Sequence, residues 1–239
     1  MGKALVYFLS INISLYKEVI SLDRQIVWLS KGTPSTLTYK GKEFRSGIAK
    51  NQVNKLKITS KGIIGDDVEN HEFHGGTERV ICVYAYEHYE YWEQLYQQSL
   101  PKAAFGENLT LKGMREQDVC VGDIYQIGEA VIQVSQGRFP CSTINKYTNI
   151  HTLLNKIIEH GYTGYFFRVL EEGFIYSDSA IKLLNKHPKE ISISTIHHTY
   201  FHDKSNLAQI ESILSLDALS EEWMLRMKKL HKSITEKSV

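Results

Sequence analysis

Glycine interrupts the apolar runs of this chain at short intervals from the N-terminus to about Gly173, and this pattern limits what the chain can fold into. The interrupting residues are Gly62 to Gly65, Gly75-Gly76, Gly106, Gly113, Gly122 and Gly128. Short apolar runs that end at turn residues are typical of strands and too brief for most helices. The pattern therefore predicts a mainly β body, whose first strand we place at Ala4 to Leu9.

One pair of runs in this body has the form of a hairpin. Asp123 to Gly128 and Ala130 to Ser135 are joined at Gly128-Glu129, and glycine allows the positive φ that tight hairpin turns need. The residues after Ser135 then leave the second strand. The segment from Tyr16 to Arg45 indicates a further extended hairpin or loop.

Helical spacing appears twice inside the body and then dominates the C-terminal part of the chain. Glu87 to Gln98 has aromatic residues on one face, and Ile150 to His160 has an apolar stripe that ends at Gly161. Beyond about Ile175, three short apolar stripes predict three helices, which must pack together or on the body because each is too short to be stable alone. Their residues are Ala180, Leu183 and Leu184; Leu207, Ile210 and Leu214; and Trp223, Met227, Leu230 and Ile234.

Composition excludes several classes of partner. With 42% hydrophobic and 23% charged residues and a formal net charge of +1, the chain has no electrostatic footprint for nucleic acid or an anionic membrane. The three cysteines are odd in number and far apart, which is typical of a reducing compartment rather than a disulfide framework. The apolar start is too short to span a bilayer. We therefore expect a cytoplasmic protein without a nucleic-acid or membrane partner.

The run Val134-Ser135-Gln136-Gly137-Arg138-Phe139-Pro140-Cys141 carries the clearest chemical signal. A thiolate is the nucleophilic and metal-binding form of cysteine, and a nearby cation lowers the thiol pKa toward that form. Arg138 is placed to supply such a cation to Cys141. The alternative is that Cys141 is a small buried apolar residue.

A second cluster lies at His71-Glu72-Phe73-His74-Gly75-Gly76-Thr77-Glu78-Arg79. Two histidines three residues apart invite a zinc site, but no nearby residues complete the three or four ligands that zinc needs. The glycine pair can instead present backbone N–H groups to an anion, and Arg79 adds a guanidinium suited to phosphate. A tight turn before the strand Val80 to Tyr84 explains the same glycines equally well.

A third motif is Phe105-Gly106-Glu107-Asn108-Leu109-Thr110, in which Asn108 offers both donors and acceptors. Taken in order, the three motifs and their surroundings resemble the MOSC domain family, named for the C-terminal domain of molybdenum cofactor sulfurase, and in particular its stand-alone bacterial YiiM-type members. The resemblance covers nearly the whole chain. It runs through Gly62-Ile63-Ile64-Gly65-Asp66, His74-Gly75-Gly76, Glu87-His88-Tyr89, Gly106 to Leu109, Val121-Gly122-Asp123, Ser135-Gln136 to Pro140-Cys141, and Thr163-Gly164 to Leu170.

The resemblance implies a β-barrel-like MOSC domain over residues 1–175, followed by a C-terminal three-helix region over residues 176–239. It also implies that the body binds the molybdenum cofactor, a molybdopterin, and that the thiolate of Cys141 is the catalytic molybdenum ligand, as soft metal centres prefer. The residues expected to hold the phosphate or pterin are His74, Gly75, Gly76, Arg79, Asn108, Arg138 and Arg168. Thr77-Glu78 replaces the usual proline-aspartate of the family, and Gly137 and Phe139 flank Arg138 where proline and a polar residue are common.

By the same resemblance, the chain is expected to reduce N-hydroxylated compounds such as hydroxylamino purines, a detoxification, with electrons from a separate reductase partner. The cofactor would carry the redox chemistry and the protein would position it. One alternative is a carrier of the cofactor, or of sulfur on Cys141, without turnover of a small molecule. Another is a thiol hydrolase that pairs Cys141 with a histidine such as His74.

Overall fold

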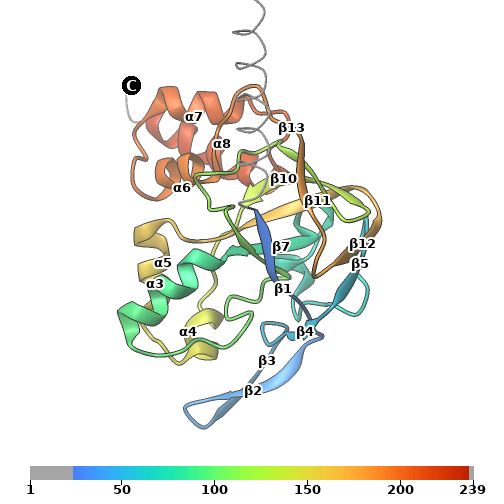
Figure 1. Ribbon diagram of the computed structural model, residues 1–239. Coiled ribbons are helices and arrows are strands. Elements are labelled where there is room, and N and C mark those ends of the chain that lie inside the picture. The colour runs from blue at the N-terminus through green and yellow to red at the C-terminus, as the bar shows by residue number, and fades with distance from the viewer. Residues whose placement is uncertain (1–23, 237–239) are drawn as a thin grey trace, which may run out of the picture.

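A curled eight-stranded sheet forms the centre of the molecule in the computed structural model, which describes residues 24–236 (Figure 1). Its order is β13-β9-β10-β11-β7-β8-β1-β4, and neighbouring strands are antiparallel except for the parallel pair β7–β8. The strands are β1 (Gln25–Lys31), β4 (Asn51–Val53), β7 (Ile81–Ala85), β8 (Leu109–Lys112), β9 (Ile124–Ile127), β10 (Ala130–Gly137), β11 (Tyr165–Glu171) and β13 (Ile181–Asn185). This half-barrel confirms the predicted barrel-like β body. The strand expected at Ala4 to Leu9 lies outside the described residues.

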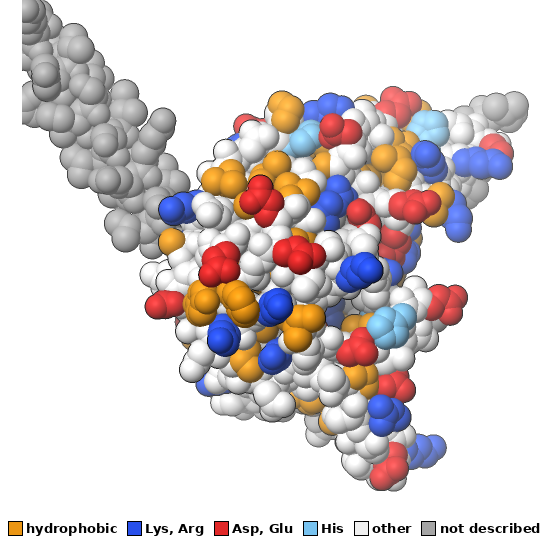
Figure 2. Space-filling model, turned by 90° about the vertical axis from the view of Figure 1, so that its right-hand side faces the viewer, with side chains coloured by type: hydrophobic (Ala, Val, Ile, Leu, Met, Phe, Trp, Pro, Cys, Tyr) orange, Lys and Arg blue, Asp and Glu red, His pale blue; other side chains and the backbone are white. Residues whose placement is uncertain are grey.

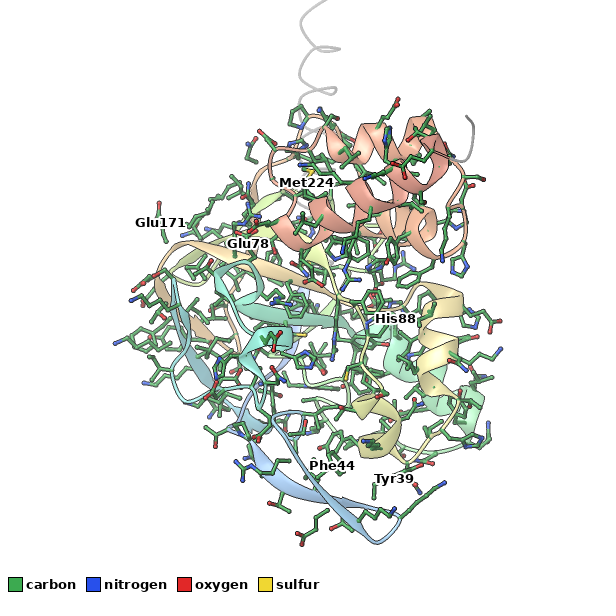
Figure 3. All side chains as sticks on the ribbon, turned by 180° about the vertical axis from the view of Figure 1, so that it is seen from behind. Tyr39, Phe44, Glu78, His88, Glu171 and Met224 are labelled. Atoms are coloured by element: carbon green, nitrogen blue, oxygen red, sulfur yellow. The ribbon has the colours of Figure 1, made fainter. Side chains whose placement is uncertain are left out.

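Two smaller sheets flank the large one. β12 (Gly173–Tyr176), β5 (Lys55–Thr59) and β6 (Gly62–Ile63) form a three-stranded sheet, and β2 (Ser35–Tyr39) pairs with β3 (Lys42–Ser46). The β2–β3 hairpin projects from the body and carries Tyr39 and Phe44 (Figure 3). The Lys146 ammonium lies 5.3 Å from the centre of the Phe44 ring, which joins the hairpin to helix α4. A hairpin therefore occupies the second half of the segment where an extended hairpin or loop was expected.

The predicted hairpin of Asp123 to Ser135 is formed by β9 and β10, in which Ala130 pairs with Ile127. Gly128 has a φ of 61°, and a Cβ atom there would approach the Phe174 carbonyl oxygen to 2.5 Å. Only glycine fits this turn, both because of its positive φ and because β12 crosses directly above it.

Two helices, α3 (Tyr86–Tyr96) and α5 (Leu153–His160), form on one side of the body where the aromatic and apolar spacing predicted them. The body also contains α4 (Thr143–Thr148), the short α2 (His71–His74) and the 3₁₀ helix η1 (Thr77–Arg79), which the spacing did not predict. Helix α5 ends at Gly161, whose φ of 72° and backbone N–H close the last turn. Trp92 of α3 is fully buried between these helices and the sheet.

The C-terminal part of the chain contains three helices, but the first is not where the sequence predicted it. Residues 181–185, expected to be helical, form strand β13 and pair with β9. The helices are α6 (Ile193–Phe201), α7 (Leu207–Leu214) and α8 (Glu221–Thr235). A short stripe of a few apolar residues cannot distinguish a helix from a strand, and here pairing with the free edge of β9 selects the strand. The sheet thus extends past the boundary expected at residue 175, and the division of the chain into a body and a helical region at that residue stays a prediction.

Helix α8 packs directly on the end of β10. The Trp223 side chain is fully buried, and its indole N–H donates to the Gly137 carbonyl over 2.7 Å. Ser220 caps the helix, and its backbone N–H donates to the Ser135 carbonyl. The larger apolar core lies between the sheet and these helices. No helix in residues 24–236 is long and apolar enough to cross a membrane.

Trp223→Phe should destabilise the protein, because it removes the indole N–H that donates to the buried Gly137 carbonyl and leaves that carbonyl with the weaker 3.5 Å contact to Gln136 Nε2. An unsatisfied buried acceptor costs about 1–3 kcal/mol, and the smaller ring adds a cavity. Urea denaturation measures the effect, with Leu225→Ala as the control because Leu225 is 52% exposed on the same helix. Equal stability of Trp223→Phe and the wild type would contradict this account of how α8 is held.

His197 of α6 makes stability depend on pH. Its Nδ1 lies 2.6 Å from Thr163 Oγ1, and burial lowers its pKa from 6.5 to about 4. The folded state thus keeps a neutral imidazole where the unfolded chain already binds a proton, so the free energy of unfolding falls as pH drops from about 6.5 toward 4. The loss should total about 3 kcal/mol, at 1.36 kcal/mol per pKa unit.

The measurement is the free energy of unfolding at pH 7.5, 6, 5 and 4.5 for the wild type and for His197→Gln, whose side chain does not titrate. The difference between the two proteins should shrink as the pH falls. Parallel curves would show that His197 does not carry this pH dependence.

Candidate functional site

Cys141 lies in the loop that connects the end of β10 to helix α4. Its sulfur is partly exposed and sits 3.3 Å from the Thr143 hydroxyl oxygen, and its carbonyl accepts the Ile144 N–H at the start of α4. The hairpin strand and the helix therefore fix the cysteine from both sides. The position immediately after the second hairpin strand is the one that the sequence predicted.

His74, at the end of α2, contacts Cys141 although 67 residues separate the two in the sequence. A hydrogen bond from His74 is the largest cause that lowers the Cys141 pKa from 9.0 to about 6; partial burial opposes it, and hydrogen bonds with Thr143 assist it. The thiol is thus mostly ionised at neutral pH. A lowered pKa was predicted, but its largest cause is His74 rather than Arg138.

The Gly75-Gly76 pair forms the turn between α2 and η1. Gly76 has a φ of 113°, and a Cβ atom at Gly75 would lie 3.1 Å from the His71 carbonyl oxygen. The Arg79 Nε donates to the Gly75 carbonyl over 2.9 Å, and the Arg79 Nη1 donates to Glu222 over 3.0 Å. The turn exists as predicted, and Arg79 braces it. Direct contact of Arg79 or of the glycine amides with an anion stays a prediction.

Arg138 enters the body from the Cys141 loop. Its backbone N–H donates to the Gly164 carbonyl, while its Nη1 is buried and has no hydrogen-bond partner among the described residues. Its charge lowers the pKa of the buried Cys82 thiol and of the Glu107 carboxyl, against the larger effect of burial, so the guanidinium lies close to both. A buried guanidinium N–H without a partner is costly and is suited to an anionic ligand.

Both the oxygen and the nitrogen of the Asn108 side-chain amide are hydrogen-bonded to other residues of the protein. Its Nδ2 donates to Asp66 over 2.9 Å and to the Ser30 carbonyl over 3.3 Å, and its Oδ1 accepts the Cys82 N–H. The amide therefore joins β1, β7 and the Asp66 loop. A direct cofactor contact by Asn108 stays a prediction, but its visible role is to hold this side of the site.

The Arg168 guanidinium is placed away from Cys141. It bonds to Glu78, to Gln133 over 3.2 Å and to the Ala218 carbonyl over 2.8 Å. Gln133 lies four residues before Gly137 on β10, or about 13 Å at the usual rise of a strand. Figure 3 shows Glu78 on the side of the sheet that the C-terminal helices cover. Arg168 thus reaches the residue that precedes Arg79, and its Nε is buried without a hydrogen-bond partner among the described residues, so its expected cofactor contact stays a prediction.

Sequence reasoning missed three residues near the site. Lys50 forms a nearly buried ion pair with Asp66, Thr143 contacts the Cys141 sulfur, and Glu222 of α8 holds Arg79. Lys50 and Asp66, and likewise Arg79 and Glu222, are distant in the sequence and meet only in the folded chain. Thr143 lies two residues from Cys141, a spacing that carries no distinctive signal. No sequence pattern therefore marked Lys50, Thr143 or Glu222. One face of the molecule has a hollow with a basic side chain inside it and a histidine beside it (Figure 2).

The residues present fit a molybdenum cofactor. The ionised, partly exposed Cys141 sulfur is the donor type that soft metal centres prefer, and the unpartnered Arg138 Nη1 is suited to a phosphate or a pterin oxygen. His74 would sit at the metal end and Arg138 deeper in the body. Asn108, Lys50 and Asp66 would support the wall rather than the ligand.

Comparisons with known proteins identify the family and the fold of this chain. Residues 70–182 match the model of the MOSC domain, and residues 191–230 match that of the YiiM-like 3-alpha helix domain. The chain is 41% identical over 199 residues to "Uncharacterized protein YflK" of Bacillus subtilis (strain 168), which covers 83% of this chain and 90% of that protein. The crystal structure of YiiM from Geobacillus stearothermophilus superposes with a TM-score of 0.74 at 34% identity, over 87% of this chain and 99% of that one.

A third relative is a Gibberella moniliformis (strain M3125 / FGSC 7600) protein named "Reductase". It is 35% identical over 158 residues, which make up 62% of this chain but only 28% of that protein. Most of the Gibberella protein therefore lies outside the shared region.

Alkylation of the cofactor-free protein by iodoacetamide should report the Cys141–His74 pair. Because the thiolate is the reactive form, the rate at Cys141 should rise with pH and reach half its maximum near pH 6. His74→Gln should move that midpoint upward, toward the ordinary cysteine pKa of 9.0. Mass spectrometry identifies the alkylated residue.

Cys82 and Cys120 are the internal controls. Burial raises the pKa of both, to about 11 for Cys120, so neither should react at pH 7. An unchanged midpoint in His74→Gln would show that His74 does not ionise Cys141.

Proposed function

The chain belongs to the MOSC domain family, and we propose that it is a molybdenum-cofactor-dependent reductase of N-hydroxylated compounds such as hydroxylamino purines. The observation that carries the proposal is the Cys141 site: a partly exposed thiol with a pKa of about 6, in contact with His74. The buried, unpartnered guanidinium N–H of Arg138 adds a place for an anionic group. A cytoplasmic location and a role in detoxification are part of the same proposal.

The reaction requires two electrons and two protons. A hydroxylamine R–NHOH is converted to an amine R–NH₂ and water, so the N–O bond breaks and the nitrogen is reduced. When bound, the molybdenum cofactor supplies the redox centre for this step. The chain itself must hold that centre, orient the substrate and manage protons.

Each site residue then has a task that its contacts support. The Cys141 thiolate would ligate the molybdenum, and the hydrogen bond from His74 would keep that sulfur deprotonated without a cost at neutral pH. Arg138 would bind the phosphate or pterin end, since its Nη1 has no other partner among the described residues. His74, hydrogen-bonded to the sulfur, would also lie beside the reacting end.

Electrons would come from a separate reductase partner. The Gibberella relative named "Reductase" supports this division of labour, because the shared region makes up only 28% of that protein. We expect the present chain to provide the molybdenum site and another protein to deliver the electrons.

One second function is favoured by a specific observation. The Cys141–His74 contact would equally serve a carrier that holds the cofactor, or a sulfur atom as a persulfide on Cys141, without turning over a small molecule. Turnover distinguishes the two: a carrier releases its cargo to an acceptor protein and leaves hydroxylamines unchanged. A thiol hydrolase that uses the same pair would release a product without any electron donor.

Cys141→Ser should abolish reduction while the fold stays intact, since serine is nearly isosteric but a poor ligand for a soft metal. The protein would be expressed with molybdate, its molybdenum and pterin contents measured, and its turnover of a hydroxylaminopurine followed with a chemical electron donor. Full turnover and full molybdenum content in Cys141→Ser would disprove the thiolate-ligand role.

Cys120→Ser is the matched control, because the Cys120 thiol is buried and its charged neighbours are Asp123, Lys186 and Glu190 rather than Arg138. Two further variants test the anionic end: Arg138→Ala should lower cofactor occupancy, and Arg138→Lys should restore it in part because lysine lacks the planar fork. A wild type that binds the cofactor but reduces no hydroxylamine would favour the carrier.

A further inference from the structure

Glu222, in the first turn of α8, is the only described carboxylate of the C-terminal helices for which hydrogen bonds to residues of the Cys141 side of the body are seen. One of its oxygens accepts from Arg79 Nη1 over 3.0 Å and from Gln136 Nε2 over 3.3 Å. The other accepts from Arg226 Nε and Nη2, at 3.1 and 2.8 Å. Glu222 thus joins α8 to two segments that approach the site from different sides.

The first of these segments is the His74 turn. Arg79 uses Nη1 for Glu222 and Nε for the Gly75 carbonyl, 2.9 Å away. Gly75 directly follows His74, and His74 is hydrogen-bonded to the Cys141 sulfur. A continuous series of contacts therefore runs from the α8 carboxylate through Arg79 and the Gly75 backbone to the sulfur.

The second segment is the end of β10. Gln136 directly precedes Gly137, where the Trp223 indole N–H is bound, and the next residue is Arg138. Glu222 and Trp223 are neighbours on α8. The first turn of that helix therefore hydrogen-bonds to the start of the Cys141 loop and, through Arg79, to the His74 turn. The helical region is therefore built into the walls of the site.

We propose that Glu222 is a positioning residue of the cofactor site: by holding Arg79 against the Gly75 carbonyl and Gln136 at the end of β10, it fixes the His74 turn relative to the Cys141 loop. The C-terminal helices then determine how well the body retains an anionic cofactor, although they supply no ligand to it. The part of this inference that concerns the cofactor rests on the proposed function. The mechanical coupling of α8 to the turn does not.

Charge, rather than shape, should carry the effect. The Arg79 and Glu222 side chains are 18% and 30% exposed, so water screens their attraction only in part. Glutamine has the shape of glutamate but lacks its charge, whereas aspartate keeps the charge on a shorter side chain. A purely space-filling role predicts that Glu222→Gln resembles the wild type and that Glu222→Asp is the worse variant. The positioning role predicts the reverse order.

The first measurement is amide hydrogen exchange of the full-length protein without cofactor. In Glu222→Gln, the peptide that contains residues 74–79 should exchange about tenfold faster, the change that corresponds to the loss of roughly one charge-assisted hydrogen bond. Glu222→Asp should recover part of the protection. Arg79→Lys should resemble Glu222→Gln, because one ammonium group cannot bridge Gly75 and Glu222 in the same way.

Two control variants isolate the effect of the Glu222–Arg79–Gly75 contacts, which we call the clamp. Glu221→Gln removes the neighbouring exposed charge from the same helical turn and should leave exchange unchanged. Arg226→Met removes the other guanidinium partner of Glu222, together with the contact of that guanidinium with the Phe139 ring at 4.3 Å, and should leave the Arg79 contact in place. If Arg226→Met accelerates exchange at residues 74–79 as much as Glu222→Gln does, helix stability rather than the clamp is responsible and the inference is overturned.

The second measurement is the molybdenum and pterin content of the same proteins after expression with molybdate and gel filtration. We expect Glu222→Gln to retain about tenfold less cofactor than Glu221→Gln, for the same lost interaction. Wild-type exchange and wild-type retention in Glu222→Gln would overturn the inference. A wild type that binds neither molybdenum nor pterin would instead defeat the proposed function, while the exchange measurement would still decide whether Glu222 holds the turn.

Discussion

The buried carbonyl of Gly137 is the point on which the rest of the structure depends. A backbone acceptor taken out of water must find a donor, and the Trp223 indole N–H provides it over 2.7 Å. The same residue has no room for a side chain, since a Cβ atom there would lie 2.1 Å from His197 Nε2. β10 therefore ends where α6 and α8 begin to cover it, and the direction in which the chain leaves toward Arg138 and Cys141 is set by this contact.

From that junction the site is assembled out of segments that are distant in the sequence. β10 and α4 deliver Cys141, the turn after α2 delivers His74, and α8 braces that turn through Arg79. Each segment supplies something that the others lack: a sulfur, a hydrogen bond that ionises it, and a carboxylate that fixes the donor. The buried Arg138 N–H has no hydrogen-bond partner among the described residues, which costs stability. The anionic ligand that we propose would supply that partner. The helical region and the β body thus act on the same few atoms.

Local patterns predicted those elements whose signal is local. The β9–β10 hairpin followed from the need for glycine at a positive φ, and α3 and α5 followed from their helical spacing. The prediction failed at residues 181–185, because a stripe of only a few apolar residues fits a strand as well as a helix, and β9 offers a free edge for pairing. Arg168 was grouped with the site on motif order; its guanidinium bonds to Glu78 and to the Ala218 carbonyl, and its contact with the cofactor stays a prediction. Which face of a strand a long side chain follows depends on partners elsewhere in the chain.

The sequence by itself determined the mainly β body, the trailing helices, the family resemblance and the position of Cys141 after a strand, because turn chemistry, apolar periodicity and motif order are properties of neighbouring residues. Only the tertiary structure decided that His74 rather than Arg138 is the main cause of the low thiol pKa, that Asn108 is used to join strands, and that Glu222 reaches across to Arg79. Hydrogen bonds and ion pairs act over a few ångströms in space, and the distance along the chain does not record which residues will be that close.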